Sequence, residues 1–425
     1  MKKRKSEDMT CYKVDIDSLL DAIIEETKKD CPGELVDLDS MWDTLYLPVP
    51  SLAVRYLLKQ EGWPLSRMAM IVGAYESCKT SFACEIGRWH NLSNGAIIWL
   101  DTEHKLSVTL MSSILQMYNI NEFNKIFKLH RCNTLEEWCK ACNMWVTKLR
   151  EAHDEGYYVP FAIVIDSLTA SLSAKIDDVM EREGPQLQRY AVEAKALTDY
   201  FKFIPKKITN YPISLICINH LKEHRNEFGA IIRQLPGGYA PKFHESIEIE
   251  CKRRSSQNPD SKTNISYVEK GKVIEGIELT LSTYKNSYAP HASIDVRFLW
   301  YLDYNEELGT QVQYTWFDWD YATTNLLVEH YSRRTPTGKF LDSIGFGFKK
   351  ERPRVWCKEL GITEESPVTF VEFGQHLETC LANNPEFKTK LYTHLGIRSC
   401  KMYQPGQSFY HQLYQNVKDT DTNDS

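Results

Sequence analysis

One short stretch of the sequence has the residues that a phosphate-binding loop requires. It reads Gly73-Ala-Tyr-Glu-Ser-Cys-Lys79-Thr80 and lies between an apolar run and a stretch with helical periodicity. In such a loop, backbone N–H groups and the helix N-terminus hold phosphate oxygens, the lysine reaches the outer phosphates, and the threonine hydroxyl ligates Mg²⁺. The sequence therefore predicts a nucleotide site in which Lys79 contacts phosphate and Thr80 contacts the metal.

The loop departs from the usual pattern at Cys78, which stands where a glycine normally precedes the lysine. If the backbone there needs a positive φ, a Cβ atom costs on the order of 1 kcal/mol, which weakens nucleotide binding without abolishing it. The alternative is a chance occurrence of the GxxxxxKT pattern. The other loop residues expected to line the site are Gly73, Glu76, Ser77 and Ser81.

Two predicted strand ends carry carboxylates that would complete such a site. The apolar run Phe161–Ile165 leads into Asp166, and a carboxylate at the C-terminal end of a parallel strand can hold a Mg²⁺-bound water. The run Ala96–Leu100 is apolar in the same way and leads into Asp101 and Glu103. Glu103 is placed to orient and deprotonate an attacking water. The alternative for each acid is simple solvation at a strand end.

These side chains need a scaffold, and the pattern of apolar runs predicts one. Strands and helices alternate from about residue 46 to about residue 325. This alternation favours an α/β fold with a mostly parallel central sheet and covering helices. The predicted parallel strands are Met68–Gly73, Ala96–Leu100, Phe161–Asp166 and Ile213–Asn219, and the segments expected to extend the sheet with antiparallel edges are Ile247–Cys251, Ile277–Tyr284 and Ile294–Trp300.

The regions that flank this core have a different character. Residues 1–45 contain an apolar face at helical spacing and are predicted to form an appendage that packs on its own core or on a neighbouring protomer. Residues 46–325 are predicted to be the nucleotide-binding core. Residues 326–425 are Arg-, Pro- and aromatic-rich at first, and we expect a linker and a small C-terminal domain that ends in an acidic, disordered tail.

Composition limits the class of protein. Of the 425 residues, 42% are hydrophobic and 25% are charged, and no apolar run is long enough for a membrane helix. The basic start lacks the apolar region of a secretory signal, so we expect a cytoplasmic protein with reduced cysteines. Cys139 and Cys142 are predicted to be ordinary helix cysteines rather than zinc ligands. The formal net charge of −6 means that any DNA site must be local.

Six segments, taken in order, resemble the core of the RecA recombinase family, and specifically its phage-like UvsX branch. They are GAYESCKTS, IIWLDTEHKLS, IVIDSLTA, LICINHLK, PGGYAPKFHESIEIECKRR and STYKNSYAP, and they cover roughly residues 48–305. One motif can arise by chance, whereas six in order do not. The resemblance implies a RecA-like ATPase core, ATP and Mg²⁺ as cofactors, and a homo-oligomeric helical filament on DNA.

The resemblance also implies roles for single residues. Lys79 and Thr80 match the phosphate and magnesium ligands, Glu103 the catalytic glutamate, and Asp166 the carboxylate behind the magnesium ion. Asn219 and His220 fall where the family senses the γ-phosphate, and the family usually has glutamine in place of the histidine. Lys285 matches one of two lysines that reach the next protomer's ATP, while the second position is Ser287. Leu110 stands near the tyrosine that often stacks on adenine.

Two loops face the DNA in this family, and they correspond to Asp177–Gln188 and Leu221–Pro241. The second loop combines basic residues, which hold phosphates, with apolar and aromatic residues, which stack on bases or wedge between them. A mobile surface loop is the alternative for each. The residues expected to contact DNA are Arg182, Arg189, Lys222, Arg225, Phe228, Arg233, Gly237 and Gly238.

The leading hypothesis is an ATP-dependent recombinase that forms filaments on single-stranded DNA and pairs it with a matching duplex. Such a protein is a DNA-dependent ATPase, works with single-strand-binding and loading proteins, and lies in the host cytoplasm if a phage encodes it. The alternatives are a hexameric RecA-fold helicase and a non-catalytic RecA-like mediator. The departures at Cys78, Leu110 and Ser287 favour the mediator, whereas the retained lysine, threonine and two carboxylates favour turnover.

Overall fold

The structure is a computed structural model that describes residues 44–168, 189–225, 231–234, 240–254, 264–333, 335–349 and 353–413. Its central sheet contains six parallel strands among the described residues. These strands are β3 (Met68–Gly73), β4 (Ala96–Asp101), β5 (Phe127–Arg131), β6 (Phe161–Asp166), β7 (Ile213–His220) and β10 (Ile247–Arg253). Four of them, β3, β4, β6 and β7, follow the predicted apolar runs. In β3, β4, β6 and β7 nearly every residue is buried, because parallel strands are covered on both faces.

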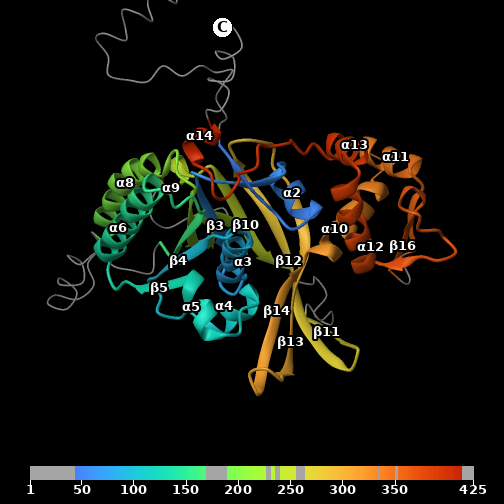
Figure 1. Ribbon diagram of the computed structural model, residues 1–425, viewed down its shortest axis with the longest axis horizontal. Coiled ribbons are helices and arrows are strands. Elements are labelled where there is room, and N and C mark those ends of the chain that lie inside the picture. Colours follow the sequence, from blue (N-terminus) through green and yellow to red (C-terminus); the bar gives the residue numbers. More distant parts are fainter. Residues whose placement is uncertain are drawn as a thin grey trace, which may run out of the picture. The chain divides into compact units, whose positions relative to one another are not determined.

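Four further strands extend this sheet with antiparallel pairing. They are β11 (Asn264–Glu269), β12 (Lys272–Asn286), β13 (Ser293–Asn305) and β14 (Thr310–Asp318). The order across the sheet is β14-β13-β12-β10-β3-β7-β6-β4-β5, with β11 paired to β12 (Figure 1). The prediction that Ile247–Cys251 is an antiparallel strand is wrong, because β10 pairs in parallel with β3 and the antiparallel pairing begins between β10 and β12. This arrangement confirms the predicted α/β fold with a mostly parallel sheet.

Helices cover the parallel part of the sheet. They are α3 (Lys79–Leu92), α4 (Val108–Leu115), α5 (Ile120–Ile126), α6 (Leu135–Asp154) and α8 (Arg189–Ile208). Trp138 and Cys142 of α6 and Phe201 of α8 share one apolar core with alternate residues of β3. α3 has a different set of partners, because its Phe82 and Trp89 contact an aromatic cluster that ends in Trp319.

The C-terminal part of the described chain is helical with a small sheet. Its elements are α10 (Trp319–Ser332), α11 (Pro336–Ser343), β15 (Phe346–Lys349), β16 (Arg354–Cys357), β17 (Val368–Thr369), α12 (Phe370–Asn383) and α13 (Pro385–Leu395). They surround a second apolar core that also takes in Leu52. The segment interpreted as a linker, Arg333–Pro336, is short, because α10 ends at Ser332 and α11 already begins at Pro336. The predicted domain boundary between residues 325 and 326 falls inside α10, and the division itself stays a prediction.

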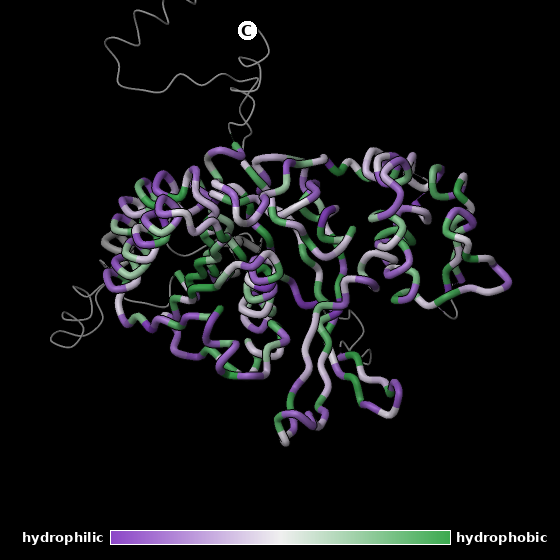
Figure 2. Tube along the Cα trace, in the orientation of Figure 1, coloured by the Kyte–Doolittle hydropathy of each residue, from purple (hydrophilic) through white to green (hydrophobic). Residues whose placement is uncertain are grey.

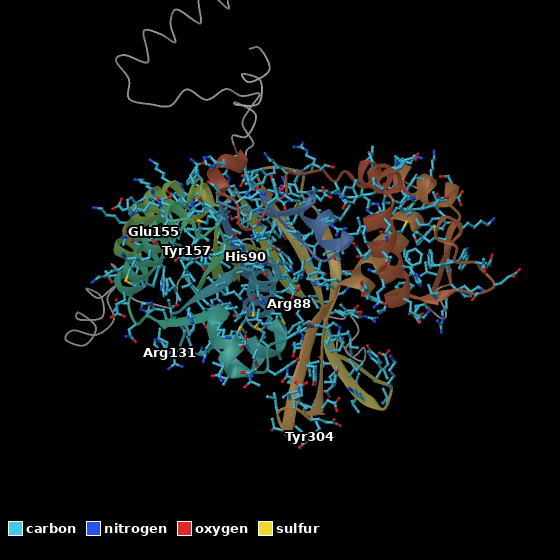
Figure 3. All side chains as sticks on the ribbon, viewed as in Figure 1. Arg88, His90, Arg131, Glu155, Tyr157 and Tyr304 are labelled. Carbon is cyan, nitrogen blue, oxygen red and sulfur yellow. The ribbon has the colours of Figure 1, made fainter. Side chains whose placement is uncertain are left out.

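The remaining short elements connect these layers. They are β1 (Tyr46–Pro48), α2 (Leu52–Leu58), β2 (Gly62–Pro64), β8 (Lys222–Arg225), β9 (Ile231–Gln234), α9 (Ala240–His244), a 3₁₀ turn (Lys358–Leu360) and α14 (Phe409–Leu413). Figure 2 shows apolar residues concentrated along the central strands, with polar residues more frequent on the covering helices. The β13–β14 hairpin projects beyond the sheet, and Tyr304 near its end is 59% exposed (Figure 3). No helix within the described ranges is long and apolar enough to span a bilayer.

Candidate nucleotide-binding site

The phosphate loop, residues 73–80, connects β3 to α3 as the sequence predicts. A Cβ atom on Gly73 would lie 2.3 Å from the backbone oxygen of Cys251, so only glycine fits beside the neighbouring strand. Glu76 and Cys78 both adopt the left-handed conformation, with φ values of 58° and 60°. The backbone at Cys78 therefore does need a positive φ, and the Cβ atom of the cysteine costs on the order of 1 kcal/mol relative to glycine.

Lys79 occupies the first position of α3 and turns back over the loop. Its Nζ donates to the backbone oxygen of Ala74 at 2.5 Å and lies 3.5 Å from Ser77 Oγ. The side chain is buried, and this burial lowers the pKa of its ammonium. Among the described residues its hydrogen-bond acceptors are neutral oxygen atoms, while the carboxylates of Asp166 and Glu103 act on its charge without a direct hydrogen bond. A buried cation of this kind can bind an anion strongly, because a phosphate would restore charge interactions that it lost with water.

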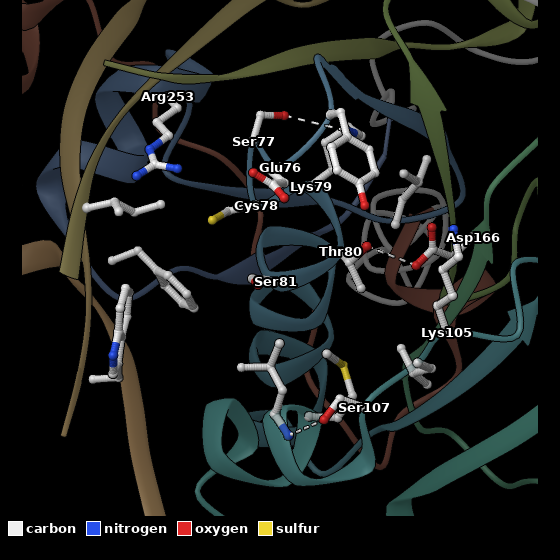
Figure 4. A pocket seen from close by; sticks show the side chains of 18 of the residues that line it. Glu76, Ser77, Cys78, Lys79, Thr80, Ser81, Lys105, Ser107, Asp166 and Arg253 are labelled. Carbon is white, nitrogen blue, oxygen red and sulfur yellow. Dashed lines mark hydrogen bonds between the residues drawn. The ribbon is translucent and has the colours of Figure 1, made fainter. Parts of the chain in front are cut away.

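Thr80 and Asp166 meet at the start of α3. Thr80 Oγ1 donates to Asp166 Oδ2 at 3.0 Å, which joins the phosphate loop to the end of β6 (Figure 4). Burial raises the pKa of the Asp166 carboxyl to about 7, and the nearby negative charge of Glu103 adds to this effect. A cation between the hydroxyl and the carboxylate would lower the pKa of Asp166 again, because it favours the ionised form of the carboxyl.

Glu103 is held by two groups at one of its oxygens. Ser167 Oγ donates to Glu103 Oε1 at 2.8 Å, and His220 Nε2 lies 2.8 Å from the same oxygen. The hydrogen bond from His220 is the main cause that lowers the pKa of Glu103 to about 2. Glu103 is thus ionised at neutral pH and able to accept a proton. Its partner Ser167 was not singled out in the sequence, although it directly follows the strand-end Asp166.

Hydrogen bonds from side chains to the backbone fix the turns that carry these residues. Thr102 Oγ1 donates to the backbone oxygen of Ser167 at 2.7 Å. Asp101 Oδ1 accepts the backbone N–H of His104 at 2.8 Å, which fixes the turn that carries Glu103. Asp101 Oδ2 is buried without a hydrogen-bond partner among the described residues. The buried Asn219 is close by on β7, where its Oδ1 accepts the backbone N–H of His220 at 2.9 Å.

A cleft of about 1140 Å³ opens over the phosphate loop. One wall is formed by α4 and the turn before it, including Leu110, and the other by β11, β12 and β13 together with Arg253 of β10 (Figure 4). The predicted residues that line this cleft are Glu76, Ser77, Cys78, Lys79, Thr80, Ser81, Glu103, Asp166 and His220. Leu110 lines this wall, and its place near an adenine stays a prediction. Arg253 also lines the cleft and was not among the site residues predicted from the sequence.

Lys285 does not lie in this cleft. It is near the C-terminal end of β12, opposite Glu248 at the start of β10. The start of β10 pairs with the start of β3, whereas the phosphate loop follows the end of β3. Lys285 is therefore at the opposite edge of the sheet from the loop of its own chain, where its ammonium donates to the backbone oxygen of Lys242.

The second predicted DNA loop contains a small hairpin. β8 and β9 pair with Lys222 opposite Gln234 and with Arg225 opposite Ile231, and the hairpin begins two residues after His220. The first predicted loop lies outside the described residues. So do Arg182, Phe228, Gly237 and Gly238, while the side chains of Arg189, Lys222, Arg225 and Arg233 are likewise not described.

The residues around Thr80 suit a magnesium ion that arrives with a nucleotide. Within the described ranges, no group of three or more His, Cys, Asp and Glu side chains could hold a metal ion by itself. Mg²⁺ usually takes one or two protein oxygens and completes its shell with waters and phosphate oxygens. The Thr80 hydroxyl, the Asp166 carboxylate and the space over the loop match that requirement.

The fold and the site together define a protein with a phosphate loop at the edge of a mostly parallel sheet. No family model matches the chain. It is 23% identical to Protein RecA of Mycoplasma mobile over 56% of its length and 62% of that protein, and 24% identical to the plasmid Protein RecA of Lactococcus lactis over 48% and 54%. It is 25% identical to Protein RecA of Bacillus pumilus over 67% and 75%.

The chain thus spans less than two thirds of the first two of these relatives. Three separate matches to proteins of one name support a relationship to the RecA family in general. They agree with the resemblance that the six segments indicated.

Proposed function

We propose that this chain is an ATP-dependent DNA recombinase of the phage-like RecA type. The observation that carries the proposal is the meeting of five side chains at one edge of the sheet. Thr80 donates to Asp166 at 3.0 Å, and Glu103 lies 2.8 Å from His220 beside the buried Lys79. The similarity to RecA proteins of three bacteria supports the same conclusion.

The residues have distinct roles in the proposed ATPase reaction. The loop backbone and Lys79 bind the phosphate chain of ATP, and Thr80 and Asp166 would hold a magnesium ion. A magnesium ion bound there would neutralise negative charge on the phosphate oxygens. Glu103 accepts a proton from the water that attacks the γ-phosphorus, and ADP and phosphate leave. Release of the hydrogen bond from His220 would raise the pKa of Glu103 from about 2 and make the carboxylate a stronger base for this step.

His220 connects this reaction to DNA in the proposed mechanism. It contacts Glu103 at one end of the nucleotide site and is two residues from β8, where the second DNA loop begins. A γ-phosphate competes with Glu103 for the imidazole N–H, so nucleotide binding and the conformation of this loop are coupled. We propose that Asn219 belongs to the same sensor, because its side chain accepts the backbone N–H of His220.

The proposed recombinase has three parts and acts as an assembly of many protomers. Residues 46–325 form the ATPase core, residues 1–45 promote oligomerisation, and residues 326–425 form a small C-terminal domain. Protomers assemble as a helical filament on single-stranded DNA in the host cytoplasm, with Lys285 directed at the nucleotide of the next protomer. Double-stranded DNA is the second substrate, and single-strand-binding and loading proteins are the further partners.

The test is ATP hydrolysis by the purified chain with and without single-stranded DNA, followed by electron microscopy of the complex. We expect DNA to stimulate hydrolysis and filaments to form with ATP. In Glu103→Gln, hydrolysis should fall by about 10²- to 10⁴-fold with ATP binding preserved, because an amide cannot accept the proton of water. Closed rings that unwind duplex DNA would indicate the helicase, and DNA binding without any hydrolysis would indicate the mediator.

A further inference from the structure

Strand β10 ends directly beside the phosphate loop. The backbone oxygen of Cys251 is so close to Gly73 that a Cβ atom there would lie 2.3 Å away, and β10 pairs in parallel with β3 up to this point. The residues that follow Cys251 are therefore carried past the tip of the loop. They are Lys252, Arg253 and Arg254.

The alternation of side chains along β10 places only some of these three cations on the face that carries Cys251. Side chains of a strand point to opposite faces in turn, so Ile249, Cys251 and Arg253 share a face and Lys252 is on the other. Cys251 is buried next to the loop, where the positive charge of Lys79 opposes the rise that burial causes in the pKa of its thiol. Arg253 is the next residue on that face and lines the nucleotide cleft (Figure 4).

The charge of Arg253 acts on the tip of the loop. Burial raises the pKa of the Cys78 thiol to about 11, and the positive charges of Arg253 and Lys79 oppose this rise. Arg253 Nη2 donates to Asn264 Oδ1 at 2.7 Å, which anchors the side chain to β11 and uses one of its five N–H donors. Figure 4 shows Arg253 on one side of the start of α3 and Asp166 on the other.

Arg254 is in a different situation, because two carboxylates accompany it. Arg254 Nη1 lies 3.0 Å from Asp295 Oδ2 and 3.7 Å from Glu278 Oε2. Its charge is thus balanced within the sheet. Arg253 and Arg254 are neighbours of the same residue type, and only the first lines the cleft.

We propose that Arg253 binds the phosphate chain of the nucleotide from the same protomer as the phosphate loop, on the side of the loop opposite the magnesium ligands. This inference rests on the proposed function, because it takes the cleft to bind a nucleoside triphosphate. A guanidinium can offer two parallel N–H groups to phosphate oxygens, whereas the ammonium of Lys79 is a single point of charge. Arg253 thereby adds a directional contact on the wall where no magnesium ion acts.

The experiment measures nucleotide affinity in the full chain without DNA, using a fluorescent ATP analogue and Mg²⁺ with unlabelled ATP as competitor. Arg253→Ala should weaken ATP binding by about 10- to 100-fold, the loss expected for a charge-assisted hydrogen bond. Arg253→Lys should recover part of the affinity. Arg253→Gln should bind as weakly as the alanine variant, because it keeps a donor for Asn264 and lacks the charge. Lys252→Ala and Arg254→Ala are the matched controls and should bind like the parent.

Each of three results would overturn the inference while the proposed function stands. One is parental affinity in Arg253→Ala. A second is parental affinity in Arg253→Gln, which would assign the side chain to holding β11 rather than to phosphate. An equal loss in Lys252→Ala would also reject it, since that would reflect net charge alone. Failure of the parent chain to bind ATP would instead reject the proposed function. Thermal unfolding of each variant without nucleotide verifies that the fold is intact.

Discussion

At the scale of single residues, the hydrogen bond between His220 and Glu103 has the largest effect on the titration of the proposed catalytic base. It lowers the pKa of Glu103 to about 2 from an ordinary value of 4.5. Because the folded-state value is the lower one, the bond stabilises the folded chain above about pH 4.5, and this contribution is lost as the pH falls toward 2. At neutral pH the glutamate remains a base whether or not nucleotide is bound.

Replacing His220 by alanine should raise the pKa of Glu103. We expect the pKa of Glu103 to rise from about 2 toward its ordinary value in His220→Ala, since the main cause of the shift is removed. The measurement is an NMR titration of the glutamate side-chain carbons, assigned with Glu103→Gln. In the control variant His220→Gln, an amide N–H can still donate and the pKa should stay low. An unchanged titration in the alanine variant would show that Ser167 alone holds the carboxylate.

At the scale of elements, Glu85 ties the helix that follows the phosphate loop to the C-terminal part of the chain. Its Oε1 accepts the indole N–H of Trp89 on α3 and that of Trp319 on α10, each at 3.0 Å. Arg88 Nη1 lies 3.5 Å from the same oxygen. Glu85 is fully buried, and burial raises the pKa of its carboxyl. The position of α3 is therefore set partly by a helix more than 200 residues later.

Glu85→Ala should destabilise the chain by about 2–4 kcal/mol, because it leaves two buried indole N–H groups without acceptors. Urea unfolding followed by tryptophan fluorescence measures this loss. Glu85→Gln, which keeps an oxygen acceptor for both indoles, should lose less. Equal stability of the alanine variant and the parent would mean that the two indoles find other partners and that α10 does not position α3.

Elements with a local signal could be predicted from the sequence, and those that depend on distant contacts could not. The apolar runs of β3, β4, β6 and β7 mark buried strands wherever they occur, so their bounds were predicted within about one residue. The contact from Glu85 to Trp319 has no local pattern, because its partners are far apart in the chain. Arg253 was likewise missed, since its place beside the loop follows from the pairing of β10 with β3.

At the scale of the whole molecule, the two halves of the proposed ATPase site lie at opposite edges of one sheet. The phosphate loop follows the end of β3, and Lys285 is near the level of its start. One protomer can therefore present its loop to a second and its lysine to a third. An interface of this head-to-tail kind generates a filament when its rotation does not close and a ring when it does.

Mixing two inactive variants tests this arrangement. Lys79→Ala destroys the loop side of each interface, and Lys285→Ala destroys the lysine side. In an equal mixture, about a quarter of the interfaces combine an intact loop with an intact lysine, so about a quarter of the parental ATPase activity should return. A mixture of Lys79→Ala with Glu103→Gln is the control and should stay inactive, because both changes affect the loop side. No recovery in the first mixture would place Lys285 outside the site.

Electrostatic contact with DNA should be local, since the whole chain has a formal charge of −6. If Arg225 and Arg233 each pair with a phosphate, the double alanine variant should flatten the slope of log affinity against log salt by about 1.4 for single strands. Phe228→Ala should weaken binding with little change in slope, because stacking releases no counterions. Arg131→Ala on β5 is a control with an exposed arginine elsewhere. A parental slope in the double variant would mean that this loop is not the DNA site.

Cys78 places a nucleophile where most phosphate loops have none. Because burial raises the pKa of its thiol to about 11, only about one molecule in 10⁴ carries a thiolate at pH 7, and simple alkylating reagents will react slowly. An electrophile attached to a nucleotide analogue would be concentrated against this sulfur by the cleft itself. The same cysteine that strains the loop thus makes the chain open to covalent inhibition directed by binding, to which a relative with glycine at this position is indifferent.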